Sequence, residues 1–217
     1  MIDEETPKQE RKSGSFLKEM PILLGVAIVV AVLVRAFLLQ TFFIPSGSME
    51  QTLDINNRVL VNKLVYDFRD PRRGEIVVFN SPESWRTAPD EKDFIKRVIG
   101  VAGDHVVCCD AQQRLMINGV SLDEPYLDKV DAPDNAAAAP EPFDVTVPAG
   151  RLWVMGDNRY HSADSLDQYQ RTDKNIQAAT ISVKSVVGRA FVLFWPLNRW
   201  DWLTVPKSFD KIPPPSS

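Results

Sequence analysis

Residues 93–101 read Asp-Phe-Ile-Lys-Arg-Val-Ile-Gly-Val, a run of β-branched and aromatic side chains interrupted by two adjacent basic residues. Residues of this kind favour strands over helices. Alternate side chains of a strand point to opposite faces of a sheet, so Lys96 should share a face with its apolar neighbours Phe94 and Val98. The stretch therefore predicts a strand that carries one lysine on an apolar face.

Similar β-rich runs, bounded by turn residues, follow one another through the chain. They occupy residues 58–64, 75–79, 104–109, 114–117, 143–147, 152–155 and 183–195. Asn118-Gly119 is a two-residue hairpin signal between the run at 114–117 and residues 120–122. No long segment after residue 40 has helical periodicity. We therefore expect a mainly β protein with an antiparallel, barrel-like β domain.

An apolar run of membrane length precedes the β region. Met20–Leu39 contains 20 residues with Arg35 as the one charge, and at about 1.5 Å per residue it spans roughly 30 Å. Four basic residues precede it, namely Lys8, Arg11, Lys12 and Lys18. Basic residues beside a span favour the cytoplasmic side. We expect a cytoplasmic tail at 1–19, one transmembrane helix at 20–40 and the remainder outside the cell membrane.

A cleaved signal peptide is the alternative interpretation of this run. Ser46-Gly47-Ser48 has the small-x-small form of a cleavage site. However, the apolar stretch is longer than the core of a signal peptide, about 7–15 residues, and it continues to Ile44 almost without a break. A retained anchor fits the run better.

The composition argues against several classes of function. The 217 residues carry a formal net charge of −4, whereas nucleic-acid-binding proteins usually present a basic patch, so we expect no nucleic acid. Two histidines and one cysteine pair fit none of the common zinc-ligand spacings, so we expect no metal and no cofactor. Cys108 and Cys109 are adjacent and would point to opposite faces of a strand, which disfavours a disulfide between them.

Three segments carry polar groups that packing alone does not require, at residues 46–48, 93–100 and 155–165. Burial of Lys96 would disfavour its ammonium form and lower its pKa from about 10.4 to roughly 8, where the amine can act as a general base. The alternative is a lysine that lies along apolar surface and extends its amine into water.

The segment 155–165 is dense in turn-forming and ionisable residues. Asp157 could pair with Arg97, and Arg159 could pair with Asp164. Two such ion pairs would brace the site without taking part in the chemistry. The alternative is a solvated turn whose side chains bond their own backbone.

A Ser–His–Asp triad is a second catalytic possibility. It would combine Ser48 and His161 with Asp157 or Asp164. The chain contains no Gly-x-Ser-x-Gly sequence, and a triad leaves Lys96 without a role.

Five pieces of the chain carry a family resemblance. They are Pro45-Ser46-Gly47-Ser48-Met49, Arg58-Val59-Leu60-Val61, Arg73-Gly74-Glu75-Ile76-Val77-Val78-Phe79, Phe94-Ile95-Lys96-Arg97-Val98-Ile99-Gly100 with Gly103-Asp104, and Gly156-Asp157-Asn158-Arg159 with Ser162-Ala163-Asp164-Ser165. Together they resemble bacterial type I signal peptidases, or leader peptidases, which are membrane-anchored serine proteases with a Ser/Lys dyad. The pieces follow the family's order and cover most of residues 41–195. A single Ser-x-Ser-Met is a weak signal, whereas all five in order after an apolar run are specific.

The resemblance implies roles for individual residues. Ser48 would be the nucleophile and Lys96 the general base, whose amine Ser162 would orient. The Ser46 hydroxyl would form the oxyanion hole with the Ser48 backbone N–H. Shallow substrate pockets would be lined by Phe42, Ile44, Met49, Leu53, Val78, Phe94 and Ile95. Structural support would come from Arg97, Asp157, Arg159 and Asp164.

The chain departs from the family pattern at three places. The family often has Pro where Gln51 stands, Gly-Asp where Asn56-Asn57 stand, and Arg where Leu166 stands. The last difference removes a usual partner of Asp164. None of the three involves the Ser/Lys dyad.

The resemblance also implies an organisation and a substrate. A catalytic β domain would occupy 41–103 and 150–205, a small inserted β region with a mobile loop 104–149, and a Pro-rich tail 206–217. The enzyme would remove signal peptides with Ala-x-Ala-like sites from exported preproteins, at the outer face of the lipid bilayer and near the translocon. Two other functions stay open, a His-dependent surface hydrolase and a non-catalytic, membrane-tethered β domain that binds envelope partners.

Overall fold

The first forty residues contribute one helix to the described part of the chain. The structure is a computed structural model that describes residues 16–33, 38–127 and 138–215, and the chain divides into two units, residues 1–38 and 39–217. Helix α1 (Phe16–Leu33) belongs to the first unit. Among the described residues, no helix is both long enough and apolar enough to cross a membrane. The predicted tail at 1–19 and anchor at 20–40 include residues 1–15 and 34–37, which lie outside the described residues.

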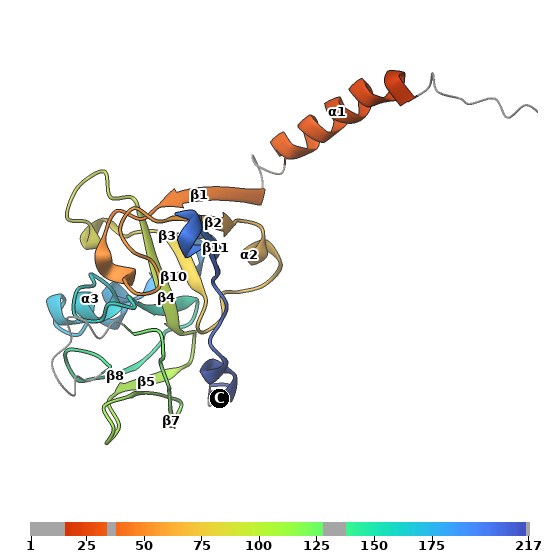
Figure 1. Cartoon of the computed structure of the whole chain (residues 1–217). Helices are drawn as coiled ribbons and strands as arrows, with labels where there is room; N and C mark the ends of the chain where they lie inside the picture. The colour runs from red at the N-terminus through yellow and green to blue at the C-terminus, as the bar shows by residue number, and fades with distance from the viewer. Residues whose placement is uncertain (1–15, 34–37, 128–137, 216–217) are drawn as a thin grey trace, which may run out of the picture. The chain divides into compact units, whose positions relative to one another are not determined.

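The second unit is built mainly from antiparallel strands, as predicted (Figure 1). Its larger sheet has eight strands in the order β1-β2-β11-β3-β4-β9-β10, with β12 paired to β11. These strands are β1 (Leu39–Phe43), β2 (Arg58–Asn62), β3 (Ile76–Asn80), β4 (Asp93–Gly100), β9 (Arg151–Met155), β10 (Ile181–Ser182), β11 (Val186–Trp195) and β12 (Asp201–Trp202). In the described residues the end strands β1 and β10 do not pair with each other, so the sheet is open. The expectation of a barrel-like closure is wrong.

A smaller sheet has four strands in the order β7-β6-β5-β8. They are β5 (His105–Cys108), β6 (Leu115–Ile117), β7 (Val120–Ser121) and β8 (Phe143–Thr146). Asn118 and Gly119 join β6 to β7, and both have positive φ angles, which a tight two-residue turn with the twist of a hairpin requires. The predicted hairpin is confirmed. The division of the chain into catalytic, inserted and tail parts stays a prediction, since residues 39–217 form one unit.

Short helices connect the strands. The α-helices of the second unit are α2 (Val65–Phe68), α3 (Ser165–Arg171) and α4 (Ile176–Ala179). The 3-10 helices are η2 (Gly47–Met49), η3 (Glu83–Trp85), η4 (Val183–Ser185), η5 (Leu197–Arg199) and η6 (Lys207–Lys211). Most of these are single turns, which agrees with the absence of helical periodicity in the sequence.

Strand β4 lies inside the large sheet, where β3 and β9 flank it on either side. Three of its residues are buried in three different hydrophobic clusters, Ile95 in one, Val98 in a second and Ile99 in a third. Packing on this scale holds a strand in one register, because a shift by one residue would turn every side chain to the opposite face. Any polar side chain on β4 therefore has a fixed position.

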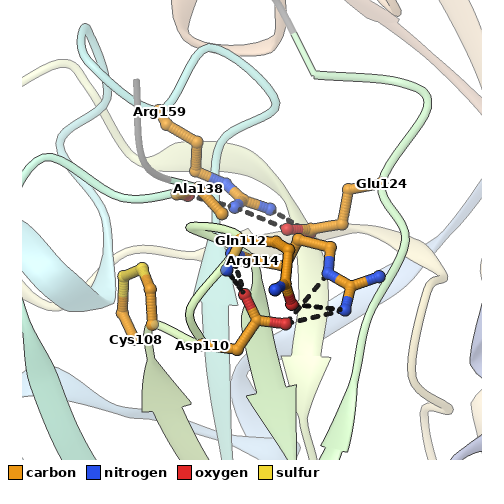
Figure 2. Close-up of a disulfide and its surroundings, with 8 residues drawn as sticks. Cys108, Asp110, Gln112, Arg114, Glu124, Ala138 and Arg159 are labelled. Carbon is orange, nitrogen blue, oxygen red and sulfur yellow. Dashed lines mark hydrogen bonds and ion pairs between the residues drawn. A yellow bond between two sulfur atoms is a disulfide. The ribbon is translucent and has the colours of Figure 1, made fainter. Parts of the chain in front are cut away.

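Cys108 and Cys109 form a disulfide (Figure 2), which the sequence analysis disfavoured. The prediction assumed that both residues belong to one strand. Strand β5 ends at Cys108, so the alternation of side chains does not extend to Cys109.

Candidate active site

Ser48 lies in the short helix η2, directly after Pro45 and Ser46. The backbone of Ser46 is extended, and Ser46 itself is exposed, whereas Ser48 is 7% exposed. The two hydroxyl oxygens are 3.5 Å apart. The turn therefore presents two hydroxyls side by side, one open to solvent and one largely covered.

Lys96 reaches Ser48 from β4. Its Nζ lies 2.5 Å from the Ser48 Oγ, although the residues are 48 positions apart in the chain. Lys96 is 4% exposed, and its Nζ is 5.6 Å from the centre of the Phe94 ring. A lysine that extends its amine into water would not be covered in this way, so that alternative is wrong.

Burial lowers the pKa of Lys96 from 10.5 to about 8, and the nearby carboxylates of Asp164 and Asp157 oppose part of this shift. Desolvation has this sign because it penalises the charged ammonium form. At pH 7 roughly one tenth of such a lysine is neutral. A neutral amine has a lone pair, so it can accept the proton that the Ser48 hydroxyl donates.

Asp157 pairs with Arg97, as the sequence analysis suggested. Its two carboxylate oxygens accept hydrogen bonds from Arg97 Nε at 2.8 Å and Nη2 at 2.6 Å. Both side chains are at most 3% exposed. Arg97 Nη1 also donates to the carbonyl oxygen of Gly74 at 2.9 Å. Because Arg97 follows Lys96 on β4, this pair ties the loop after β9 to the strand that carries the lysine.

Arg159 does not pair with Asp164, which corrects that prediction. Figure 2 shows the Arg159 guanidinium beside Glu124 and Ala138. Arg159 Nη1 and Nη2 donate to the Glu124 carboxylate at 3.1 and 2.5 Å, and both side chains are at most 3% exposed. Arg159 Nε donates to the carbonyl oxygen of Gly156 at 3.0 Å. A carboxylate from a distant loop therefore supports the segment that holds Asp157.

Asp164 acts instead on the backbone. It precedes α3, where its carboxylate accepts a hydrogen bond from Leu166 N at 3.0 Å and a weaker one from Asp167 N at 3.5 Å. The same carboxylate accepts a hydrogen bond from Gly156 N at 2.9 Å. The Asp164 carboxylate therefore caps helix α3 and also holds the turn at Gly156. Burial raises the pKa of Asp164, against the opposing hydrogen bonds.

Ser162 lies nearby without making the predicted hydrogen bond to Lys96. Its hydroxyl oxygen is buried and has no hydrogen-bond partner in the part of the chain that the structure describes. It is close enough to Asp164 to lower the pKa of that carboxyl, but this contact falls short of hydrogen-bond geometry. Ser162 therefore interacts with Asp164 in this state and makes no hydrogen bond to Lys96.

Six of the seven predicted pocket residues gather in one apolar region. Four of them are at most 1% exposed and share a hydrophobic cluster, namely Ile44, Met49, Leu53 and Val78. Ile95 belongs to the same cluster and Phe42 packs against it, whereas Phe94 packs against another cluster. Met49 follows Ser48 directly, so this region begins beside the Ser48–Lys96 contact.

The triad alternative does not form. His161 is exposed, and among the described residues no hydrogen bond joins its ring to Ser48. The two candidate acids are occupied elsewhere, Asp157 by Arg97 and Asp164 by the start of α3. The described residues also hold no group of three or more histidine, cysteine or acidic side chains suited to a metal ion.

Three further residues contact the site without having been singled out. Glu124 pairs with Arg159, and Thr52 Oγ1 donates to Asp157 at 2.5 Å. Asn158 N donates to the Ser48 carbonyl oxygen at 3.2 Å. Asn158 lies inside one of the matching sequence pieces and could have been found there. Glu124 and Thr52 lie outside all five pieces, so their contacts with the site had no local signal.

Comparison with known proteins identifies the relatives of this chain. The family model for "Signal peptidase, peptidase S26" matches residues 17–195. "Signal peptidase I" of Mycobacterium tuberculosis is 36% identical over 222 residues, covering 86% of this chain and 75% of that protein. "Signal peptidase I" of Leptolyngbya laminosa is 36% identical over 200 residues, covering 91% and 89%. The crystal structure of a signal peptidase I from Enterococcus faecalis has a TM-score of 0.42 and 30% identity, covering 56% of this chain and 97% of that one. The chain belongs to the peptidase S26 family of signal peptidases.

Proposed function

We propose that this chain is a membrane-anchored signal peptidase I that removes signal peptides from exported preproteins with a Ser/Lys dyad. The observation that carries the proposal is the contact of 2.5 Å between the Lys96 amine and the Ser48 hydroxyl. The lysine is buried and its pKa is lowered to about 8. A binding module would gain nothing from a lysine held in this state. The relatives are named signal peptidase I, which supports signal peptides as the substrate.

In the proposed acylation step, neutral Lys96 takes the proton of Ser48 while the Ser48 oxygen attacks the scissile carbonyl carbon. The protonated amine then gives a proton to the leaving nitrogen, and the peptide bond breaks. In the second step Lys96 takes a proton from water, which attacks the ester carbonyl carbon, and the protonated amine then returns this proton to the Ser48 oxygen as the ester C–O bond breaks. The acyl-enzyme is thus formed and hydrolysed by one base.

Ser46 and Ser162 have supporting roles in this proposal. The Ser46 hydroxyl and the Ser48 backbone N–H would stabilise the oxyanion, and loss of one such donor costs about 10- to 1000-fold in rate. The proximity of the two hydroxyls, 3.5 Å, supports this role for Ser46. Ser162 would turn its hydroxyl towards the Lys96 amine, because no hydrogen bond of good geometry to the described residues fixes it elsewhere.

The apolar region beside Ser48 would select the substrate. Ile44, Met49, Leu53 and Val78 are almost fully covered in this state, so a substrate side chain would find little depth beside them, and we expect shallow pockets. Shallow pockets accept alanine and exclude larger side chains, which leads to Ala-x-Ala-like cleavage sites. A steric selection of this kind separates small residues by about 1–3 kcal/mol per methylene.

We place the protein in the cell membrane, with one span at 20–40, the amino terminus in the cytoplasm and residues 41–217 outside, near the translocon. The apolar run and the preceding basic residues support this topology. Protease added to intact spheroplasts should digest the carboxyl-terminal part. Protection until the cells are lysed would overturn the topology and the substrate together.

Turnover of a model preprotein in detergent tests the chemistry. Ser48→Ala and Lys96→Ala should abolish cleavage, whereas His161→Ala should retain most of it. Lys92→Ala is a matched control, because Lys92 is exposed and directly precedes β4. Cleavage by Lys96→Ala at the wild-type rate would refute the dyad, and loss of cleavage in His161→Ala alone would favour a histidine-dependent hydrolase.

A further inference from the structure

A pocket of about 520 Å³ lies apart from the Ser48–Lys96 site and shares no lining residue with it. Its volume lies within the range of small-molecule pockets, about 300–1,000 Å³. Four arginines line it, and two acids lie among them, namely Arg69, Arg72, Arg73 and Arg189 with Glu75 and Asp210. The charge of this lining is therefore positive.

Two of the four arginines are neutralised by buried carboxylates. Arg69 donates to both oxygens of Glu75, at 2.5 and 3.0 Å. Arg73 Nε donates to Asp104 at 2.6 Å, and Arg73 Nη2 donates to the other oxygen of that carboxylate. Bidentate pairs of this kind account for both guanidinium groups as parts of the fold.

Glu75 is shared between two arginines, Arg69 and Arg189. Besides the two bonds from Arg69, it accepts hydrogen bonds from Tyr66 Oη at 3.1 Å and from Arg72 N at 2.9 Å. Three of these four donors bond Oε2, and Oε1 accepts a hydrogen bond from Arg69 alone and forms the ion pair with Arg189. Arg189 Nε lies 3.5 Å from Glu75 Oε1, is buried, and has no hydrogen-bond partner among the described residues.

The side chain of Arg72 has no hydrogen bond or ion pair in the described part of the chain, where its backbone N–H donates to the Glu75 carboxylate and its carbonyl oxygen accepts from Glu75 N. Arg72 is exposed, and so is Asp210. Counting Glu75, Asp104 and Asp210 against the four arginines leaves one guanidinium charge in excess. The fold thus holds two arginines beside the pocket that are not fully paired: Arg72, and Arg189, which shares the carboxylate of Glu75 with Arg69.

The carboxyl-terminal segment completes the walls of this pocket. Phe209, Pro214 and Pro215 line it. The segment is held in place by Asn118 Nδ2, which donates to the Pro213 carbonyl oxygen at 3.0 Å, and by the close packing of Phe209 on Gly74. Gly74 has a φ of +80°, and a Cβ at that position would lie 2.7 Å from the Phe209 ring. The pocket is therefore a built feature of the fold.

The geometry points to a binding site for a phosphate group in this pocket, with Arg72 and Arg189 as its ligands. Guanidinium groups bind phosphate oxygens through paired N–H donors and keep their charge at all physiological pH values. The phosphate could belong to an anionic lipid headgroup or to a soluble ion. Phe68 does not line the pocket, but it is 84% exposed and directly precedes the lining residue Arg69, so an apolar side chain is available for a lipid one residue away in the chain.

Two measurements on the full-length protein in detergent separate these sources. Calorimetric titration with inorganic phosphate tests the soluble ion. Native mass spectrometry with phosphatidylglycerol or phosphatidylcholine counts lipid molecules that stay bound. Wild type should bind one phosphate ion or retain one phosphatidylglycerol in preference to phosphatidylcholine, and Arg72→Ala/Arg189→Ala should bind at least tenfold more weakly. Ser48→Ala should bind like wild type, because the site does not depend on catalysis.

Arg171→Ala/Lys184→Ala is the matched control, since it removes two exposed positive charges outside the pocket. It should bind like wild type. If Arg72→Ala/Arg189→Ala fails to fold, Arg72→Ala alone decides, because that exposed side chain has no structural contact to lose; it should weaken binding several-fold. Failure of wild type to bind either ligand overturns the proposal. Equal weakening in the control also overturns it, because it would show a non-specific charge effect.

Discussion

Gly156 packs directly against the backbone of Ser48. A Cβ at position 156 would lie 2.3 Å from the Ser48 carbonyl oxygen and 2.4 Å from the Ser162 Oγ, closer than real Cβ contacts. The loop after β9 can therefore approach the candidate nucleophile only because residue 156 has no side chain. The next residues of that loop hold Ser48 O and Arg97 by hydrogen bonds, so the close approach positions both halves of the site.

Gly156→Ala should reduce turnover strongly. The new methyl group meets a backbone oxygen that cannot move without displacing Ser48, and a misplacement of about 1 Å can cost 10²-fold in rate. Overpacking should also lower the free energy of unfolding by about 1–3 kcal/mol. Single-turnover cleavage and urea denaturation measure the two effects. Gly25→Ala is the control, since nothing lies within 4 Å of its Cβ position and both quantities should stay near wild type.

The pH dependence of cleavage should follow the neutral form of Lys96. Because burial lowers the pKa of that amine to about 8, kcat/KM should rise about tenfold per pH unit below pH 8 and level off above it. With a surface lysine this rise in kcat/KM, the acidic limb of the pH profile, would continue to about pH 10.5. Rates measured from pH 6 to 10 with a fixed preprotein give the pKa of the free enzyme.

Asp164→Asn should move this acidic limb to lower pH, because the Asp164 carboxylate raises the pKa of Lys96. Asparagine keeps the helix-capping oxygen, so α3 should persist. Asp167→Asn, which removes a charge one turn into the same helix, should leave the limb in place. If neither variant shifts the limb, the Asp164 carboxylate does not contribute to the pKa of the lysine.

Lys96→Met should be inactive and more stable than wild type at pH 7. The folded-state pKa of about 8 lies below the unfolded value of 10.5, so the unfolded chain binds more protons between these pH values. The wild-type free energy of unfolding should therefore rise with pH from 8 to 10.5 relative to the variant. This difference in pKa corresponds to about 3 kcal/mol of destabilisation of the folded wild type. The destabilisation is fully present below pH 8 and absent above pH 10.5.

Urea denaturation of both proteins at pH 7 and pH 10.5 tests this difference. Subtracting the free energy of unfolding of Lys96→Met from that of wild type removes the contribution of every other titrating group. Lys92→Met should show no such dependence, because Lys92 is exposed. A Lys96→Met variant that is less stable than wild type at pH 7 would mean that the hydrogen bond to Ser48 outweighs the cost of burial.

The sequence predicted the strands better than their assembly. The run of β-branched and aromatic residues at 93–101 predicted β4 correctly, and six of the strand's eight residues are buried in the sheet interior. Alternation says nothing about whether the two end strands meet, and β1 and β10 do not pair. Helix α3 was missed although Asp164, an aspartate with the position of a cap, precedes it. The run 165–171 is too short to show helical periodicity, so the cap was its one local signal.

The predictions of the site also divide into those that the local sequence supports and those that depend on the fold. Burial of Lys96 followed from its apolar strand, but its contact with Ser48 came from the family resemblance, because no local pattern joins residues 48 positions apart. The pair Asp157–Arg97 was suggested from charge alone and is present. The same reasoning gave Arg159 the wrong partner, since the nearer acid, Asp164, is occupied by backbone N–H groups. Glu124 reaches Arg159 only through the fold of the chain.

Glu124→Gln should lower the free energy of unfolding by about 3–5 kcal/mol. Both members of its pair with Arg159 are at most 3% exposed, and removing one charge leaves the other buried without compensation. The loss should reach the site as well, because Tyr126 donates to Glu124 at 2.7 Å and stacks under Arg97, whose guanidinium lies 3.9 Å from the ring centre.

Urea denaturation followed by tryptophan fluorescence gives the stability. Glu141→Gln, on an exposed residue, is the control and should change it by less than about 0.5 kcal/mol. Equal stability of the two variants would show that the carbonyl oxygens of Ala138 and Gly156 suffice to hold Arg159.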